Sequence, residues 1–414
     1  MKIAKTILIL TFLFSTLCTF ASWSDWYVDN SVSDPAPDGS KKHPFSTIQE
    51  AVAASQAKQA VFSADTIYIK GTGNPYYGPI EIPNQNAMRL KGYGDLKPEI
   101  TLTGAVEATT IKSGDNYRNP TYACMPPAQV GLENLIIKNE STSPNLHYAA
   151  DVQCWVSWEA SVTGFPERIR LGILDCSFLA RGSNVCLRVR DLDQRHNQEL
   201  IDADHRSLVT RCFFQGSRDL VHLSAQQKVD LTSNIFYAGQ SALYFEDMTN
   251  SVYSRLTQDV RITYNRFFHQ RNGALFSGIY PDFLFQNNTC IGLNGTHLAF
   301  LQEKLEARGE VSVLRNIFVS GANVLALAEE GWENLLSVND NLFFNVAAVG
   351  DQQEIADPQF LSEELISADF LRPAETSPAV HPGYYLGAVA PVPEPTLIFI
   401  SLLSALVIFG TRKA

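Results

Sequence analysis

The sequence predicts an all-β solenoid, a fold in which short strands from successive coils stack on one another. A motif recurs about every 25 residues along the second half of the chain, and such self-similarity is typical of repeat folds. Each copy is too short to bury its apolar side chains without a neighbour above and below it. The 414 residues would suggest two or three domains at about 100–200 residues each. The repeat favours a single elongated domain instead.

Each copy of the motif has two alternating apolar residues, then an asparagine, any residue and a phenylalanine. The asparagines of the clear copies are Asn234, Asn265, Asn316 and Asn341, and a degenerate copy has Asn288 with Cys290 in place of the phenylalanine. A second apolar pair follows the phenylalanine, as in Leu220-Val221 and His297-Leu298. We therefore expect strand, bend, strand and loop in each coil. Because an asparagine amide can satisfy backbone groups and its neighbour above, we expect a structural ladder at the bend.

The first half fits the same solenoid less regularly. Strand-like runs separated by Gly, Pro and Asn occur at 66–69, 80–82, 88–90, 100–102 and 135–137. Residues 114–128 and 141–167 carry no clear repeat, and we interpret them as long loops or a protruding excursion.

A helical pattern precedes these strands, from Phe45 to Ala60. Its apolar face consists of Ile48, Ala51, Val52 and Ser55, with Ser46 or Thr47 as N-cap. A solenoid needs its open end covered, so we expect this helix to cap the stack.

The N-terminus predicts export. Lys2 and Lys5 precede an apolar run from Ile7 to Leu17, and small residues follow up to Ala21, as in a secretory signal peptide. We therefore predict cleavage after Ala21. The alternative, an N-terminal membrane anchor, would need a longer apolar run of about 18 residues.

The C-terminus combines Pro393-Glu394-Pro395, an apolar stretch over 396–410, and a basic end. This order resembles the PEP-CTERM sorting tail of exopolysaccharide-producing Gram-negative bacteria. The resemblance implies a transient transmembrane helix, processing by an exosortase, and release or attachment at the cell surface. A plain C-terminal anchor would give the same topology. The expected organisation is a signal peptide at 1–21, one repeat domain at 22–390 and a sorting tail at 391–414.

The charge balance is acidic, with 43 acidic and 32 basic residues and a net charge of −11. Nucleic-acid binding, which would leave a basic footprint, is therefore disfavoured. After loss of Cys18 six cysteines remain, in a compartment that permits disulfides. We expect Cys124 and Cys154, in the irregular region, to be the likelier pair. Four others fall inside the repeat and are expected in the core: Cys176, Cys186, Cys212 and Cys290.

Several short segments carry a resemblance that spans nearly the whole mature chain. Trp26-Tyr27-Val28-Asp29, 44–51 and 65–69 look like the opening of secreted pectin-lyase-like proteins, and 357–360 with 386–388 look like their closing segment. The resemblance implies a single-stranded right-handed parallel β-helix. This fold carries lyases, hydrolases, epimerases, adhesins and proteins without chemistry, so it does not specify an activity.

Outward-facing polar residues on the coils between about 170 and 265 form the candidate site. We predict Asp219, His222 and Glu246 as catalytic residues, because His222 can exchange a proton near carboxylates on neighbouring strands. The predicted substrate-binding residues are Arg188, Arg190, Arg211 and Tyr244, since arginines hold acidic sugars through charge-assisted bonds. The alternative is that these charges are solvated and neutralise one another across the coils.

Known catalytic patterns of this fold are not visible. The sequence has no Gly-His-Gly segment and no Arg-x-Pro-x-x-Arg element, and it has no phosphate loop or paired metal ligands. Asp34 and Asp38 could suggest calcium but fit a turn-rich lead-in better, so no cofactor is predicted. Whether the protein is an enzyme stays open.

We expect an exported protein of the cell surface or extracellular matrix that binds or processes polysaccharide. As an enzyme it would be a polysaccharide lyase or a glycoside hydrolase. The alternative is a non-catalytic structural or adhesion protein of the biofilm matrix. Beyond polysaccharide, the expected partners are signal peptidase and exosortase, and the oligomeric state stays open.

Overall fold

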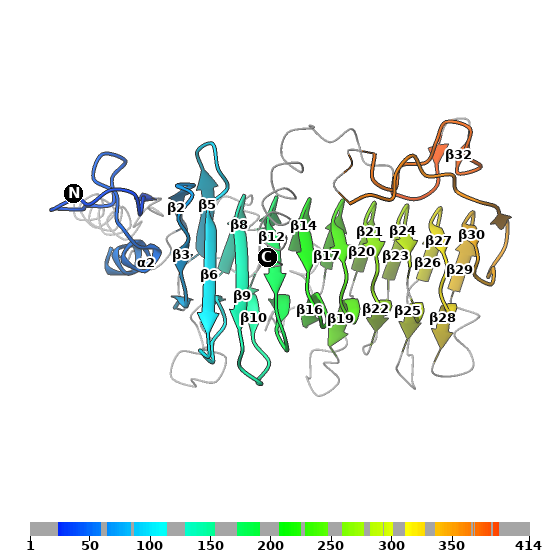
Figure 1. The fold of residues 1–414 in the computed structure, drawn as a ribbon, viewed down its shortest axis with the longest axis horizontal. Coiled ribbons are helices and arrows are strands. Elements are labelled where there is room, and N and C mark those ends of the chain that lie inside the picture. Colours follow the sequence, from blue (N-terminus) through cyan, green and yellow to red (C-terminus); the bar gives the residue numbers. More distant parts are fainter. Residues whose placement is uncertain are drawn as a thin grey trace, which may run out of the picture.

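The fold is a stack of parallel strands in three long sheets, which confirms the predicted parallel β-helix (Figure 1). The computed structural model describes residues 24–58, 64–83, 87–113, 129–153, 172–190, 207–224, 228–246, 259–276, 282–292, 294–300, 311–327, 336–365, 367, 369–381 and 384–388. Each complete coil contributes one strand to each sheet, in the order sheet 1, sheet 2, sheet 3.

The strands of each sheet follow the chain from one end of the stack to the other. Sheet 1 consists of β1 (Asp25–Val28), β2 (Ala64–Lys70), β5 (Ala87–Tyr93), β8 (Gln129–Glu133), β11 (Ile173–Leu174), β14 (Ser207–Thr210), β17 (Lys228–Thr232), β20 (Asp259–Thr263), β23 (Asp282–Gln286), β26 (Val311–Leu314) and β29 (Leu336–Asn339). Sheet 2 consists of β3 (Tyr76–Tyr77), β6 (Glu99–Gly104), β9 (Ile136–Ser141), β12 (Ser177–Ala180), β15 (Phe213–Gln215), β18 (Ile235–Tyr237), β21 (Arg266–Phe268), β24 (Thr289–Ile291), β27 (Ile317–Val319), β30 (Leu342–Phe344) and β31 (Glu354–Ile355). Sheet 3 consists of β4 (Ile80–Ile82), β7 (Ile111–Ser113), β10 (Tyr148–Gln153), β13 (Val185–Arg190), β16 (Val221–Ser224), β19 (Ser241–Glu246), β22 (Asn272–Phe276), β25 (Thr296–Phe300) and β28 (Asn323–Leu327).

A column of phenylalanines runs up the inside of sheet 2. Phe178, Phe214, Phe236 and Phe267 pair in register on successive coils, and their ring centroids lie 5.1, 5.0 and 4.9 Å apart. Each of these rings is fully buried. Stacked aromatic pairs add about 0.5–1.5 kcal/mol each beyond the area that they bury. The phenylalanine of the sequence motif therefore belongs to the core of the solenoid.

The bend between sheets 1 and 2 has the same backbone shape in successive coils. The residue just before each asparagine of the motif adopts a left-handed conformation, for example Ser233 at φ 57° and Asn287 at φ 53°. The asparagine that follows is buried, and its side chain bonds the next coil. Asn265 Oδ1, for instance, accepts from the backbone N–H of Asn234 at 2.9 Å and from Asn234 Nδ2 at 3.0 Å. The five asparagines form one continuous ladder: Asn234, Asn265, Asn288, Asn316 and Asn341.

The helix α2 (Ile48–Ala57) covers the N-terminal end of the stack, as predicted. Its buried face consists of the four expected residues, Ile48, Ala51, Val52 and Ser55. The helix begins later than Phe45 because Thr47 has extended backbone and forms a capping box with Glu50.

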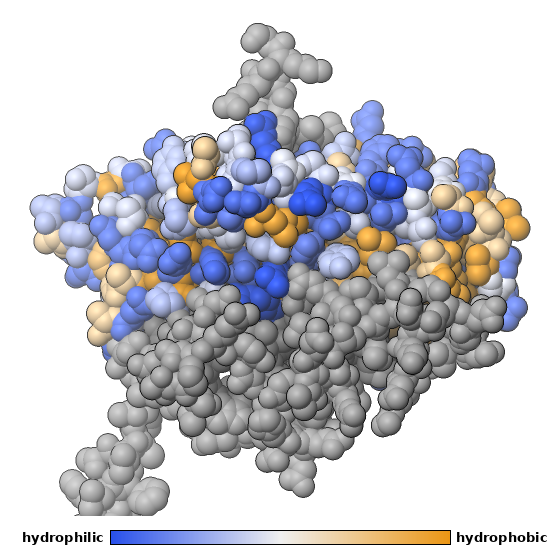
Figure 2. Space-filling view, turned by 90° about the horizontal axis from the view of Figure 1, so that it is seen from below, coloured by the Kyte–Doolittle hydropathy of each residue, from blue (hydrophilic) through white to orange (hydrophobic). Residues whose placement is uncertain are grey.

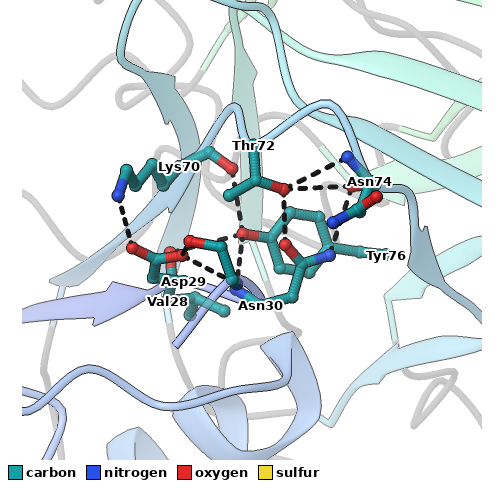
Figure 3. A network of polar contacts seen from close by, with 8 residues as sticks. Val28, Asp29, Asn30, Lys70, Thr72, Asn74 and Tyr76 are labelled. Atoms are coloured by element: carbon teal, nitrogen blue, oxygen red, sulfur yellow. Dashed lines mark hydrogen bonds and ion pairs between the residues drawn. The ribbon is translucent and has the colours of Figure 1, made fainter. Parts of the chain in front are cut away.

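A polar network ties the lead-in strand β1 to the first coil. Figure 3 shows Asp29 beside Lys70, with its carboxylate 2.6 Å from the Lys70 ammonium, and Asn30 beside Tyr76 and Asn74. Burial raises the pKa of Tyr76 to about 12, so its hydroxyl stays neutral and donates to the carbonyl of Lys70. Asp34 and Asp38, farther along the lead-in, accept turn hydrogen bonds from the N–H groups of Ala36 and Ser40.

The last part of the described chain returns along the outer face of sheet 2, shown in orange in Figure 1. Phe370 meets Phe268 edge to face at 5.1 Å, and the N–H of Ala388 donates to Thr289 Oγ1 at 2.8 Å. A short antiparallel pair, β32 (Val380–His381) with β33 (Tyr384–Tyr385), lies within this segment. The return segment buries outward apolar residues of sheet 2, including Ile291 and Ile317.

Figure 2 shows a largely hydrophilic surface over the described residues, with hydrophobic residues gathered at the right-hand end of the view. The stack ends there, because β28 is the edge strand of sheet 3. Leu325 and Leu327 of β28 are accordingly only partly buried against the core.

The expected signal peptide and the sorting motif Pro393, Glu394 and Pro395 lie outside the described residues. Within the described ranges, no helix is long and apolar enough to cross a membrane.

Candidate functional site

Three of the predicted residues lie in one row on the outer side of sheet 3. Arg188 of β13 pairs in register with His222 of β16, which pairs with Tyr244 of β19. Side chains of a strand alternate between its two faces. Since Leu187 and Val189 point into the core and are fully buried, Arg188 and its two neighbours point outward.

These side chains contact one another through their rings and the guanidinium group. His222 lies with its ring centroid 5.2 Å from that of Tyr244 and 5.9 Å from that of Tyr148 on β10. The Arg188 guanidinium carbon lies 5.7 Å from the centre of the Tyr148 ring, within the range of a cation–π contact. We call Tyr148, Arg188, His222, Tyr244 and Asp219 the sheet 3 cluster.

Tyr148 was not among the predicted site residues. Residues 141–167 were interpreted as a long loop, and this was wrong for 148–153, which form the strand β10. Tyr148 was therefore not considered as a site residue. The signal that could have found it is the short apolar run from Tyr148 to Val152, which Asp151 alone interrupts.

Asp219 holds the imidazole of His222 from the turn that leads into β16. Asp219 Oδ2 lies 3.2 Å from His222 Nε2. Burial by itself would raise the pKa of Asp219, but contacts with His222 and Ser241 and the charge of Arg218 hold that pKa below its usual range. The carboxylate therefore stays ionised and fixes the orientation of the ring, as a carboxylate does for a histidine that transfers protons.

Arg190 points the same way as Arg188 but is enclosed by protein. Its Nε donates to Asp151 Oδ1 at 2.7 Å, and its Nη2 donates to the carbonyl and hydroxyl oxygens of Ser113. Only 5% of the Arg190 side chain is exposed. The structure thus places this arginine in a buried ion pair that joins three coils.

Arg211 lies at the bend between β14 and β15, apart from the sheet 3 cluster. Its Nε and Nη2 each lie 2.7 Å from a different carboxylate oxygen of Asp175, in a bidentate pair. Half of the Arg211 side chain is exposed. The structure does not bring Arg211 together with His222, because the bend and sheet 3 are different sides of the coil.

Glu246 is the last residue of β19 and pairs in register with Ser224. Tyr244 lies two positions earlier on the same strand, so the backbone of Glu246 is adjacent to the cluster.

The cluster combines aromatic rings, a guanidinium group and a histidine held by a carboxylate. Tyrosine and histidine rings offer apolar faces with polar edges, and Arg188 offers donors for a carboxylate. Of the described side chains in the cluster, Asp219 supplies the one carboxylate, whereas glycoside hydrolysis usually employs two. Among the described residues, no group of three or more His, Cys, Asp or Glu could hold a metal ion.

Comparisons with known proteins give few matches. No family model and no curated protein matches the chain. Among solved structures, the chain is similar to YbhC of Escherichia coli at 15% sequence identity, with a TM-score of 0.34. That likeness covers 86% of this chain and 84% of the other.

Proposed function

We propose that the protein is exported and binds polysaccharide at the cell surface or in the exopolysaccharide matrix through the sheet 3 cluster. The observation that carries the proposal is the row of Arg188, His222 and Tyr244 with Tyr148 beside it. Aromatic and arginine side chains on adjacent coils suit a chain of sugar rings, which needs apolar contacts and charge-assisted bonds along its length.

The net negative charge of the protein disfavours an acidic glycan except where positive charge is concentrated at one place. The net charge of −11 repels a polyanion over most of the surface. Arg188 supplies positive charge within the cluster, so a uronic acid would be attracted there rather than to the protein as a whole. Export, predicted from the two ends of the sequence, would place the cluster where such glycans occur.

Glycan binding by single-residue variants tests this proposal. Purified mature protein is titrated with a panel of uronic-acid and neutral polysaccharides. We expect Arg188→Gln and Tyr244→Ala each to weaken binding about tenfold or more, equivalent to about 1.4 kcal/mol. Arg211→Gln is the matched control, because this arginine lies at the bend, and it should bind like the unaltered protein. Equal affinities for all variants, or no binding across the panel, would contradict the proposal.

A second candidate is glycan cleavage, favoured by the contact between Asp219 and His222. In a lyase or hydrolase, His222 would transfer the proton, with Glu246 as a further carboxylate and Asp219 orienting the ring. Unsaturated products from uronic-acid polysaccharides would be followed by absorbance, and new reducing ends would report hydrolysis. Loss of product in His222→Gln with glycan binding retained would support cleavage. Absence of product on the whole panel would leave a non-catalytic matrix or adhesion protein as the better description.

A further inference from the structure

The asparagine ladder stops at Asn234, and cysteines occupy the same place in the two preceding coils. Ser177, Phe213 and Ile235 pair in register, and the residues directly before them are Cys176, Cys212 and Asn234. The backbone has the same form at each bend, since Asp175 and Arg211 both adopt φ 53°. Asn234 Oδ1 accepts from the N–H of Cys212 at 2.9 Å, as it would from another asparagine of the ladder.

The two cysteines lie on consecutive coils at equivalent positions of the bend. Cys212 Sγ lies 3.6 Å from the carbonyl oxygen of Ile173, on the coil of Cys176, and the Cys176 side chain helps to raise the pKa of Cys212. Adjacent parallel strands are about 4.8 Å apart, and disulfides join Cα atoms about 4.4–6.8 Å apart. The stacking therefore places the two Cα atoms within the range that disulfides join, while both cysteines are free thiols in this structure.

Once the coils have closed, the surrounding residues shield both thiols from solvent. Both thiols are buried, and Lys97 reaches the same bend, where its ammonium donates to the carbonyl of Asp175 at 2.6 Å. Burial raises the pKa of Cys212 well above its ordinary value, so the folded chain keeps a neutral thiol. The thiolate is the reactive form of cysteine. Thiol–disulfide exchange therefore takes place during folding, before the coils close over the two cysteines.

We propose that Cys176 and Cys212 form a disulfide that joins two consecutive coils where the asparagine ladder ends. A thiolate of one cysteine attacks an external disulfide, such as oxidised glutathione, and releases one reduced glutathione. The second cysteine thiolate then attacks the protein sulfur of the mixed disulfide and releases the second. Two protein thiols and one oxidised glutathione thus give one protein disulfide and two reduced glutathiones. The bond replaces ladder hydrogen bonds and closes the long connection from β12 to β14.

Oxidative refolding of the purified protein tests the disulfide apart from export and glycan binding. The protein is refolded with oxidised glutathione, alkylated, digested and analysed by mass spectrometry. We expect a linked pair of peptides containing Cys176 and Cys212, about 2 Da lighter than their sum because two hydrogens are lost. Reduction should lower the Tm by about 5 °C, given the long loop that the bond closes.

Cysteine variants separate the cross-link from a general effect of reductant. Cys176→Ala and Cys212→Asn should each abolish this drop in Tm, and Cys212→Asn should still fold because asparagine continues the ladder. Cys290→Ala is the matched control, because this buried cysteine lies in the phenylalanine column of sheet 2, between Phe267 and Phe318, and it should retain the drop. Recovery of Cys176 and Cys212 as alkylated thiols, as glutathione adducts or linked to other cysteines from folded protein would overturn the proposal.

Discussion

The bend between sheets 1 and 2 and the outer row of sheet 3 are built on the same coils but by opposite rules. At the bend, one residue type repeats over five coils, and each asparagine amide bonds its equivalent on the next coil. In the outer row, every coil has a different residue: Asp151, Arg188, His222 and Tyr244. A residue type that repeats at fixed spacing thus marks a structural column. At the outer position the residue type differs from coil to coil, so the stacking of the coils does not require one particular side chain there.

The largest expected effect comes from breaking the buried ion pair between Arg190 and Asp151, the first residue of the outer row. Asp151→Ala removes the carboxylate that meets the buried Arg190 guanidinium, and loss of one partner of a buried pair costs about 3–5 kcal/mol. Urea unfolding measures the change. Asp175→Asn is the control, because asparagine tolerates the left-handed backbone of this position, its partner Arg211 is half exposed, and exposed pairs contribute about 1 kcal/mol or less. Similar losses in the two variants would show that burial does not distinguish the pairs.

The next largest effect is a loss of stability at low pH, caused by a buried histidine of sheet 3. His297 is buried, donates from Nε2 to the carbonyl of Ser320 at 2.8 Å, and packs on Phe318. Burial lowers the pKa of His297 from 6.5 to about 4. As the pH falls from 6.5 to 4, the unfolded chain therefore binds a proton that the folded chain does not, and stability falls by up to about 3 kcal/mol.

Unfolding midpoints between pH 7 and pH 4 measure this loss. His297→Gln can still donate to Ser320 but does not titrate in this range, so its stability should change less with pH. An equally steep loss in His297→Gln would assign the acid sensitivity to other groups.

The ladder itself gives the third prediction. Asn288→Ala removes the acceptor of the Asn265 N–H and the donor to the carbonyl of Ile262. Buried groups left without partners cost about 1–3 kcal/mol, so we expect a loss of about 2–3 kcal/mol in denaturant unfolding. Asn339→Ala is the control, since its amide donates to nearby Ser337 in a partly exposed strand, and should change stability by about 0.5 kcal/mol or less.

The smallest expected effect tests the contact between Asp219 and His222. The pKa of Asp219 lies below its ordinary value of 3.8 in the folded chain, so the unfolded chain is protonated first as the pH falls. Stability from this contact is present above about pH 4 and is lost below it. Asp219→Asn should reduce the loss of stability between pH 5 and pH 3, and His222→Ala should reduce it as well. An unchanged slope in both variants would show that the contact adds no stability.

The predicted architecture rested on local signals, and these were sufficient for the fold. The parallel stack and the capping helix are both present, with the helix boundary moved to Ile48 by its capping box. The sequence named Arg188, His222 and Tyr244 as candidate residues of these coils, but it did not predict that they pair in register in one row.

The predicted site residues have different surroundings because their partners come from distant parts of the chain. A local sequence pattern does not show these partners. Arg188 and Arg190 are two positions apart on one strand, yet Arg190 is enclosed because Asp151 and Ser113 of earlier coils meet it. Arg211 is engaged by Asp175, which lies 36 residues earlier in the chain. These partners depend on the lengths of the connections between coils, which set the register.

The sequence by itself determined the repeat, the alternation of core and surface positions and the capped end, because these depend on neighbours along the chain. Only the tertiary structure decided which charges pair, that Tyr148 joins His222, and that Cys176 lies beside Cys212. Stacking brings together residues from different coils, and their contacts follow from the register between strands rather than from the sequence around either residue.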